Sequence, residues 1–93
     1  MIQAFKNKDI EKLFRTGKSQ NVPADIHERA LMRLARIDAA VVIEDLRLPP
    51  SHHLEKLKGD RKDSWTLRIN QQWRICFAWQ DGHAFDVEII DYH

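Results

Sequence analysis

The chain has 93 residues, among them 15 Lys or Arg, 14 Asp or Glu and a single cysteine, Cys76. This length suits one domain over residues 1–93 with a modest core, which excludes a separate cofactor-binding domain, and one cysteine excludes an internal disulfide. No apolar run approaches the roughly 20 residues that a membrane span requires, and residues 1–6 lack the apolar stretch of a signal peptide. We therefore expect a cytoplasmic protein with no membrane partner.

The first half of the chain predicts a short strand and two helices. Residues 2–5 alternate apolar and polar side chains, Asn7 is a suitable N-cap for a first helix, and Gly17 is a suitable end for it. Pro23 suits the first position of a second helix. That helix has apolar residues at spacings of three and four, with charged residues mostly on its other sides. The apolar residues are Ile26, Ala30, Leu34 and Ile37, and the charged ones are Glu28, Arg29, Arg33 and Arg36.

The second half predicts a loop followed by three strands. Pro49 and Pro50 interrupt regular structure, so residues 51–62 are expected to cross the surface as a loop or an irregular segment. Runs over residues 65–69, 73–80 and 83–92 alternate with period two and are expected to share one buried face. The residues of that face are Trp65, Leu67, Ile69, Trp73, Ile75, Phe77, Trp79, Phe85, Val87 and Ile89. The prediction is an α+β fold, with an N-terminal strand and a two-helix hairpin packed on one face of a small antiparallel sheet.

The same alternation predicts the turns and the opposite face of the sheet. For the apolar residues to stay on one face, each turn must hold an odd number of residues, which suggests 70–72 and 80–82. Arg68, Arg74 and Glu88 would then lie in one row on the opposite face. Two facing arginines repel each other, so this row needs an anion, either Glu88 or a bound phosphate.

Charge is unevenly spread along the second half. From Lys56 to Arg74 there are six basic residues and two acidic ones, whereas residues 75–93 include four acidic ones and no Lys or Arg. A local basic surface is therefore expected on a protein that is nearly neutral as a whole.

Four segments in this half carry a recognisable set of side chains. They are Leu57-Lys58-Gly59-Asp60-Arg61, Leu67-Arg68-Ile69-Asn70, Gln72-Trp73-Arg74-Ile75-Cys76-Phe77 and Asp91-Tyr92-His93. In this order and at this spacing, the chain resembles, essentially from end to end, the HigB toxins of bacterial toxin–antitoxin systems, the plasmid-maintenance killer branch of the RelE superfamily.

The resemblance implies a RelE-like α+β fold and a ribosome-dependent endoribonuclease that cuts mRNA in the decoding site. It also implies a helix-turn-helix antitoxin, HigA, as the partner that silences the toxin. The complex of the two would repress its own operon, with operator DNA bound only through the antitoxin complex.

Metal-free RNA cleavage requires a base for the 2′-hydroxyl, cations for the charged transition state and an acid for the leaving 5′-oxygen. Lys58 and Arg74 are the candidates for the cations. His93 is a candidate for the acid or the base, and Tyr92 for orienting the 2′-hydroxyl or stacking on a base. The expected supporting or RNA-binding residues are Arg68, Asp91, Arg61 and Asn70. No cofactor is expected.

Several alternatives remain open. In one, Arg74 pairs with Glu88 only as part of the structure of the sheet. In another, Tyr92 covers the core and His93 is a frayed terminus. Glu55 stands where some relatives have a histidine, so the source of proton transfer at that position is open. The adjacent His52 and His53 lack the further spaced ligands of a zinc site, so no metal is expected, and the two histidines are expected to border the cleft. At the level of function, the alternatives are a non-catalytic RNA- or ribosome-binding module and a degenerate toxin that acts only with its antitoxin in operon repression.

Overall fold

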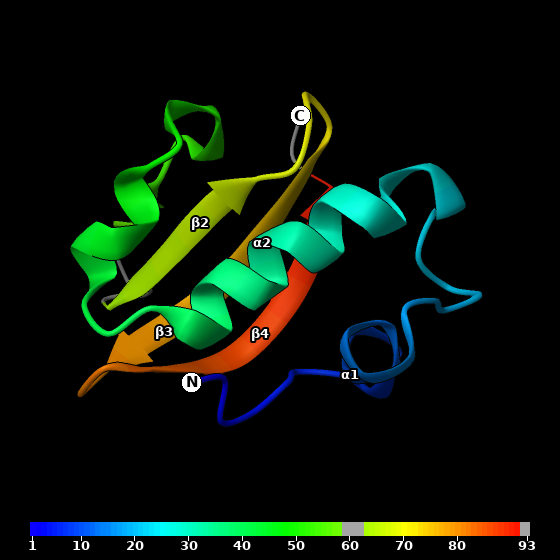
Figure 1. The fold of residues 1–93 in the computed structure, drawn as a ribbon, viewed down its shortest axis with the longest axis horizontal. Helices are drawn as coiled ribbons and strands as arrows, with labels where there is room; N and C mark the ends of the chain where they lie inside the picture. Colours follow the sequence, from blue (N-terminus) through cyan, green and yellow to red (C-terminus); the bar gives the residue numbers. More distant parts are fainter. Residues whose placement is uncertain (59–62, 92–93) are drawn as a thin grey trace.

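The computed structural model of the protein describes residues 1–58 and 63–91. Its elements, in which η denotes a short 3₁₀ helix, are α1 (Lys8–Thr16), η1 (Ala24–Ile26), α2 (His27–Ala39), η2 (Ile43–Arg47), η3 (Pro50–His52), β1 (Glu55–Lys56), β2 (Ser64–Arg68), β3 (Trp73–Gln80) and β4 (His83–Asp91). The strands form one antiparallel sheet in the order β1-β2-β3-β4. Figure 1 shows α2 lying across one face of this sheet, with α1 seen end-on to one side of α2. The predicted α+β fold is confirmed, and none of the described helices is long and apolar enough to cross a membrane.

Local capping signals set both ends of α1, as predicted. The side chain of Asn7 accepts a hydrogen bond of 3.1 Å from the backbone N–H of Ile10. At the other end, Gly17 has a left-handed φ of 89°, and its N–H donates to the carbonyl of Leu13 at 2.8 Å. Pro23 directly precedes η1, which continues into α2 at His27.

The strand predicted for residues 2–5 is present only as two isolated parallel bridges to β4. Ile2 pairs with Ala84, and Phe5 pairs with Val87. Because β4 is the last strand of the sheet, this segment covers an edge that would otherwise present unpaired backbone groups to solvent.

The core fills the space between the two helices and the sheet. The predicted apolar stripe of the second helical region is confirmed, since each of its residues is at most 2% exposed. These residues are Ile26, Ala30, Leu34 and Ile37. Arg33 was expected on an outer side of α2 but is buried, and its Nε donates a hydrogen bond of 2.6 Å to the carbonyl of Arg68 at the end of β2. This bond satisfies a strand-end carbonyl that a purely apolar helix face would leave without a donor.

The predicted loop over residues 51–62 is wrong in part, because η3 and the two-residue strand β1 lie within it. Glu55 pairs with Thr66, and Lys56 pairs with Trp65. The ammonium of Lys56 lies 5.6 Å from the Trp65 ring centroid. Two polar residues carry no hydrophobic alternation, so sequence periodicity gives no sign of this strand.

The register of β2 on β3 is as predicted, with Arg68 opposite Arg74. The second turn differs from the prediction, because Gln80 pairs with His83 and leaves only Asp81 and Gly82 between the strands. Both turn residues have positive φ, 53° and 80°, as the tight hairpin turns that match strand twist require.

A bulge in β4 then restores the alternation that this even-numbered turn would reverse. The register shifts between Cys76 and Ala78, opposite Asp86, which has a φ of 52°. Ala84 and Val87 are therefore both fully buried, while Phe85, predicted to lie on the buried face, points to the other side. The shift also separates the predicted row of charges, as described below.

Candidate active site

Arg74 is the centre of the candidate site. It lies in β3, is 9% exposed, and extends its guanidinium toward two neighbouring strands. Its Nη1 donates to Thr66 Oγ1 of β2 at 2.8 Å, and its Nη2 lies 3.2 Å from Glu55 Oε1 of β1. The carbonyl of His53, just before β1, is 3.5 Å from Nη1. The guanidinium is therefore oriented by groups from two segments, strand β2 and residues 53–55.

The pairing of β1 with β2 explains this arrangement. Glu55 is opposite Thr66, so the carboxylate and the hydroxyl are neighbours on one face of the sheet. Arg74 lies two residues before Cys76, the residue opposite Thr66, and its long side chain reaches along the face to both groups. A guanidinium carries its donors in a planar fork, the geometry that binds two oxygens of a phosphate.

The predicted row of Arg68, Arg74 and Glu88 is wrong. Because of the β4 bulge, Ile90 is opposite Arg74, and Glu88 is opposite Cys76. Glu88 forms an ion pair of 3.0 Å with Lys6, which follows the N-terminal segment. The carboxylate that compensates Arg74 comes instead from Glu55 in β1, at the edge of the sheet opposite β4, and sequence alternation does not predict it.

The structure brings Arg68 next to Arg74, as predicted, and gives Asn70 a structural role. Arg68 Nε donates to the carbonyl of Asn70 at 3.2 Å. Asn70 Oδ1 accepts hydrogen bonds from the backbone N–H groups of Gln72 and Trp73, each at 2.8 Å. The Asn70 side chain therefore holds the β2–β3 turn in shape, in the manner of an Asx turn.

Lys58 and Asp91 are the other predicted site residues that the structure describes. Lys58 is exposed and follows β1, and no hydrogen bond or ion pair links it to another residue of ranges 1–58 and 63–91. Asp91 ends β4 opposite Trp73, and its carboxylate accepts a hydrogen bond of 3.2 Å from Gln72 Nε2. The predicted residues Arg61, Tyr92 and His93 lie outside the described residues.

Glu55 and Thr66 are the members of the site that sequence reasoning did not assign, whereas His53 was expected to border the cleft, and its carbonyl lies 3.5 Å from Arg74 Nη1. Thr66 shares the parity of Arg68 and Arg74, so its place on this face follows from the alternation alone. The contribution of Glu55 depends on the pairing of β1, for which the sequence has no local signal.

Beside the site, His52 is buried and its Nδ1 lies 3.1 Å from the carbonyl of Leu46. Burial lowers the pKa of this histidine, and the charges of Arg33 and Arg36 lower it further, against the opposing effect of the hydrogen bond. A neutral imidazole at position 52 therefore donates Nδ1–H to the carbonyl.

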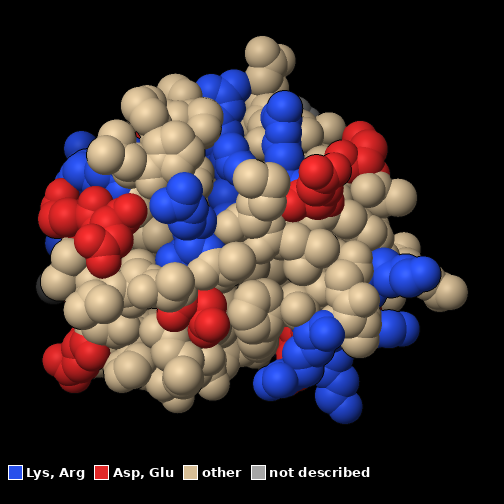
Figure 2. Space-filling model, in the orientation of Figure 1, with Lys and Arg blue, Asp and Glu red and all other residues tan. Residues whose placement is uncertain are grey.

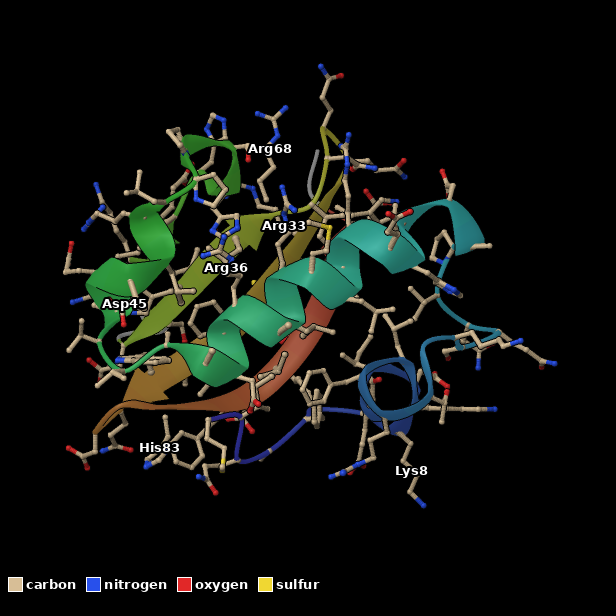
Figure 3. All side chains as sticks on the ribbon, viewed as in Figure 1. Lys8, Arg33, Arg36, Asp45, Arg68 and His83 are labelled. Carbon is tan, nitrogen blue, oxygen red and sulfur yellow. The ribbon has the colours of Figure 1, made fainter. Side chains whose placement is uncertain are left out.

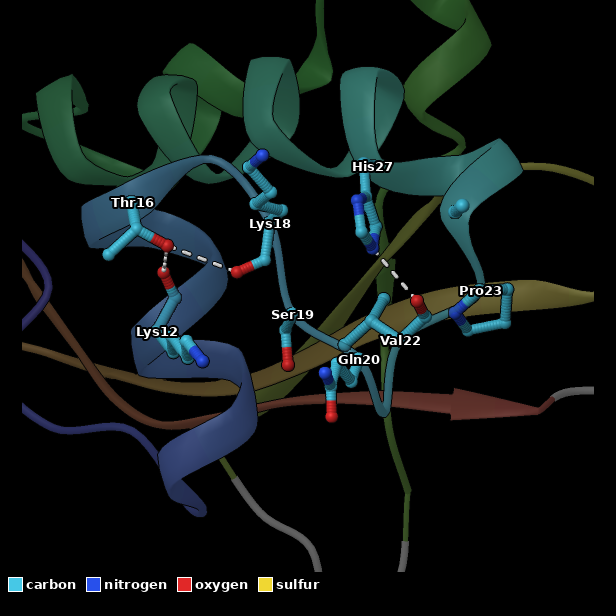
Figure 4. Close-up of a pocket in the computed structure, with 9 residues that line it drawn as sticks. Lys12, Thr16, Lys18, Ser19, Gln20, Val22, Pro23 and His27 are labelled. Carbon is cyan, nitrogen blue, oxygen red and sulfur yellow. Dashed lines mark hydrogen bonds between the residues drawn. The ribbon is translucent and has the colours of Figure 1, made fainter.

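A hollow among the described residues lies elsewhere, between α1 and the start of α2 (Figure 4). Its volume is about 580 Å³, and none of the predicted site residues that the structure describes lines it. Ser19 lines it with a buried hydroxyl that has no hydrogen-bond partner among the described residues. Lys12, Lys18 and His27 line it, but none of the described side chains around it is an arginine or a carboxylate.

Known proteins of one family are similar to this chain over nearly all of its length. A family model described as the RelE-like toxin of the type II toxin–antitoxin system HigB matches residues 3–93. A protein named Endoribonuclease HigB, from Proteus vulgaris, is 38% identical over 93 residues, which is all of both chains. Toxin HigB-1 from Vibrio cholerae is 34% identical over 87 residues, or 92% of each chain.

Solved structures show the same fold at lower identity. The YoeB-YefM complex from Staphylococcus aureus contains a chain with a TM-score of 0.60 and 21% identity, covering 100% of this chain and 98% of that one. YafQ from E. coli has a TM-score of 0.56 and 12% identity, covering 98% of this chain and 93% of the other. At these identities the likeness establishes the architecture alone.

Proposed function

This chain belongs to the HigB-like family, the RelE-like toxins of type II toxin–antitoxin systems, and we propose that it is an endoribonuclease that cleaves mRNA on translating ribosomes. In this proposal the activity resides in a single domain over residues 1–93 and acts in the cytoplasm, where its substrate is translated. An antitoxin of the HigA kind, with a helix-turn-helix, silences it, and operator DNA is bound only through the complex of the two.

The proposed reaction needs no metal. The 2′-oxygen of one nucleotide forms a bond to the adjacent phosphorus, and the bond from that phosphorus to the 5′-oxygen of the next nucleotide breaks. A base takes the proton of the 2′-hydroxyl, and an acid gives a proton to the leaving 5′-oxygen. The products end in a 2′,3′-cyclic phosphate and a 5′-hydroxyl.

The observation that carries the proposal is the fixed orientation of Arg74. Arg74 is 9% exposed, and its guanidinium is held by Thr66 Oγ1 at 2.8 Å and Glu55 Oε1 at 3.2 Å. A cation that is already oriented stabilises the charge that develops on the phosphoryl oxygens without first paying for reorganisation. Stabilisation of this kind is commonly among the largest contributions to catalysis.

The remaining roles follow the family resemblance. Lys58 is the second cation, and Tyr92 and His93 supply orientation and proton transfer. Arg61, Arg68, Asn70 and Asp91 are assigned to support and RNA binding. Glu55 adds a second candidate for the base beside His93, because its carboxylate lies 3.2 Å from the guanidinium that would hold the phosphate.

The activity is tested by primer extension on a defined mRNA with the purified protein, with and without translating ribosomes. The wild type is compared with Arg74→Lys, which keeps the charge and loses the fork, and with a chain that lacks His93. We expect cuts only when ribosomes are present, and strong reductions in both variants. An absence of cuts by the wild type, together with retained ribosome binding, would favour the non-catalytic module or the degenerate toxin.

Glu55→Gln separates the two candidate bases, since the amide keeps the size of the side chain and cannot accept the proton as a carboxylate does. If Glu55 is the base, cleavage falls by roughly 10²- to 10⁴-fold, the usual contribution of a general acid or base. A fall of only a few-fold would leave Glu55 as a partner of Arg74 and assign the base to His93.

A further inference from the structure

A hollow lined by cationic and polar side chains lies where α2, η3 and the β2–β3 turn meet. It has a volume of about 300 Å³, at the lower end of the range for small-ligand sites. Arg29 lines it from α2, Arg68 from the end of β2, and Ser51 and His53 from η3 and the residue that follows. None of the described residues that line it is acidic.

Two further arginines of α2 add to the positive charge on this side of the molecule. Figure 3 shows Arg33 and Arg36 on the side of the helix that faces Arg68 and η3. Figure 2 shows Lys and Arg side chains gathered on the corresponding part of the surface, with acidic groups off to either side. Across ranges 1–58 and 63–91, no carboxylate lies within ion-pair distance of Arg29, Arg33, Arg36 or Arg68.

The positive potential is strong enough to act on neighbouring groups. Burial lowers the pKa of Arg33, and the charge of Arg29, one helical turn away, lowers it further. The charges of Arg33 and Arg36 likewise add to the effect of burial in lowering the pKa of His52. Like charges gathered in this way repel one another until an anion binds among them.

The donors in the hollow match a phosphate. Arg29 and Arg68 provide planar guanidinium groups, which suit phosphate oxygens better than a point charge does. Ser51 provides a hydroxyl, and Asn70 contributes its NH₂ group, because its Oδ1 already accepts the two N–H groups of the turn. A phosphodiester needs only donors and positive charge, and the hollow provides both.

The hollow is continuous with the candidate active site through two residues. Arg68 lines the hollow and pairs with Arg74 across the sheet. His53 also lines it, while its carbonyl lies 3.5 Å from Arg74 Nη1. We propose that this hollow binds a phosphate group of RNA other than the one that is cleaved. The inference rests on the proposed function only in naming RNA as the ligand, and that RNA is either the message or ribosomal RNA.

The test measures RNA binding, not cleavage, so that its failure is distinct from failure of the proposed activity. Arg29→Gln removes one charge from the hollow, and Arg15→Gln is the matched control, because it removes one charge from exposed α1, where Arg15 pairs with Glu11. Arg29→Lys keeps the charge. Dissociation constants are determined over a series of salt concentrations, in one arm with a single-stranded RNA oligonucleotide and in the other with vacant ribosomes free of mRNA. Thermal unfolding curves establish that each variant is folded.

Each phosphate contact on a single strand contributes about 0.7 to the slope of log K against log salt. We expect Arg29→Gln to weaken binding several-fold and to reduce this slope by about that amount, while Arg29→Lys keeps the slope and Arg15→Gln has no such effect. A change confined to the oligonucleotide assigns the phosphate to the message, and one confined to vacant ribosomes assigns it to ribosomal RNA.

Equal slopes for Arg29→Gln and Arg15→Gln in both arms would overturn the inference. A third arm with poly-glutamate addresses a different occupant. If Arg29→Gln weakened binding of poly-glutamate and of neither RNA, the phosphate assignment would be wrong and the hollow would be a site for an acidic protein partner.

Discussion

Replacement of Thr66 by valine is expected to loosen the candidate site while leaving the shape of the sheet intact. Thr66 is 1% exposed, and its hydroxyl accepts a hydrogen bond of 2.8 Å from Arg74 Nη1. Valine has nearly the same volume, and both residues favour strands, so the substitution removes one hydrogen-bond acceptor and little else. The guanidinium then faces a methyl group in place of an oxygen.

The cost follows from the kind of bond that is lost. A hydrogen bond from a charged donor contributes about 1.5–3 kcal/mol, and a donor left facing an apolar group pays its desolvation in addition. For a domain of this size, 1 kcal/mol corresponds to a change of about 4–8 °C in Tm, so a decrease of roughly 6 °C or more is expected. Cleavage should fall by roughly ten- to a hundredfold, because small misplacements of a group that positions the phosphate carry penalties of that order.

Thr66→Ser is the matched control, since it keeps the hydroxyl and loses the methyl group. Urea and thermal unfolding measure stability, and ribosome-dependent primer extension measures cleavage. The reasoning predicts that the serine variant retains most of the cleavage and the valine variant does not. Equal cleavage by the two variants would refute the view that the Thr66 hydroxyl orients Arg74, and an unchanged Tm for the valine variant would refute the estimate of the bond.

Two further predictions concern stability. Both Gly17 and Gly82 have left-handed φ, so a Cβ at either position lowers the free energy of unfolding by about 1–2 kcal/mol. A Cβ at Gly82 would also lie 3.1 Å from the Val41 carbonyl oxygen, while nothing lies within 4 Å of one at Gly17. Gly82→Ala should therefore lower the free energy of unfolding in urea by more than Gly17→Ala does. Equal losses of unfolding free energy in the two variants would show that the contact of a Cβ at position 82 with the Val41 carbonyl has no effect on stability. Folding lowers the pKa of His52, so the unfolded chain binds a proton at a higher pH than the folded chain does. The contribution of the neutral His52 side chain to the free energy of unfolding is therefore complete above about pH 6.5, and it is lost as the pH falls toward the folded-state pKa. Unfolding free energies measured between pH 7.5 and 5 should therefore fall less steeply for His52→Gln than for the wild type, by at most about 1.4 kcal/mol per pH unit, and parallel curves would contradict this.

The family relationship can be recognised from the sequence, whereas the contacts of the candidate site depend on the tertiary structure. The motifs around Lys58, Arg74 and the terminal residues are contiguous in sequence, so the resemblance they carry is available before any fold is known. The relation of Arg74 to Glu55 is a matter of strand pairing, and it changes the chemical interpretation by placing a carboxylate beside the cation.

The sequence by itself determined the features that depend on neighbours a few residues apart. The caps of α1 at Asn7 and Gly17, the buried stripe of α2 and the register of Arg68 on Arg74 all follow from local hydrogen bonds and side-chain period. Each of these features can be predicted from residues close together in the chain.

Only the tertiary structure decided the rest. β1 exists because two polar residues pair with β2, and the bulge at Asp86 exists because a two-residue turn reverses the alternation that the core requires. Both depend on contacts between strands that pair across the sheet, and no local sequence pattern predicts the free energy of those contacts. That is why alternation offered Glu88 as the carboxylate beside Arg74, whereas the structure has Glu55 there.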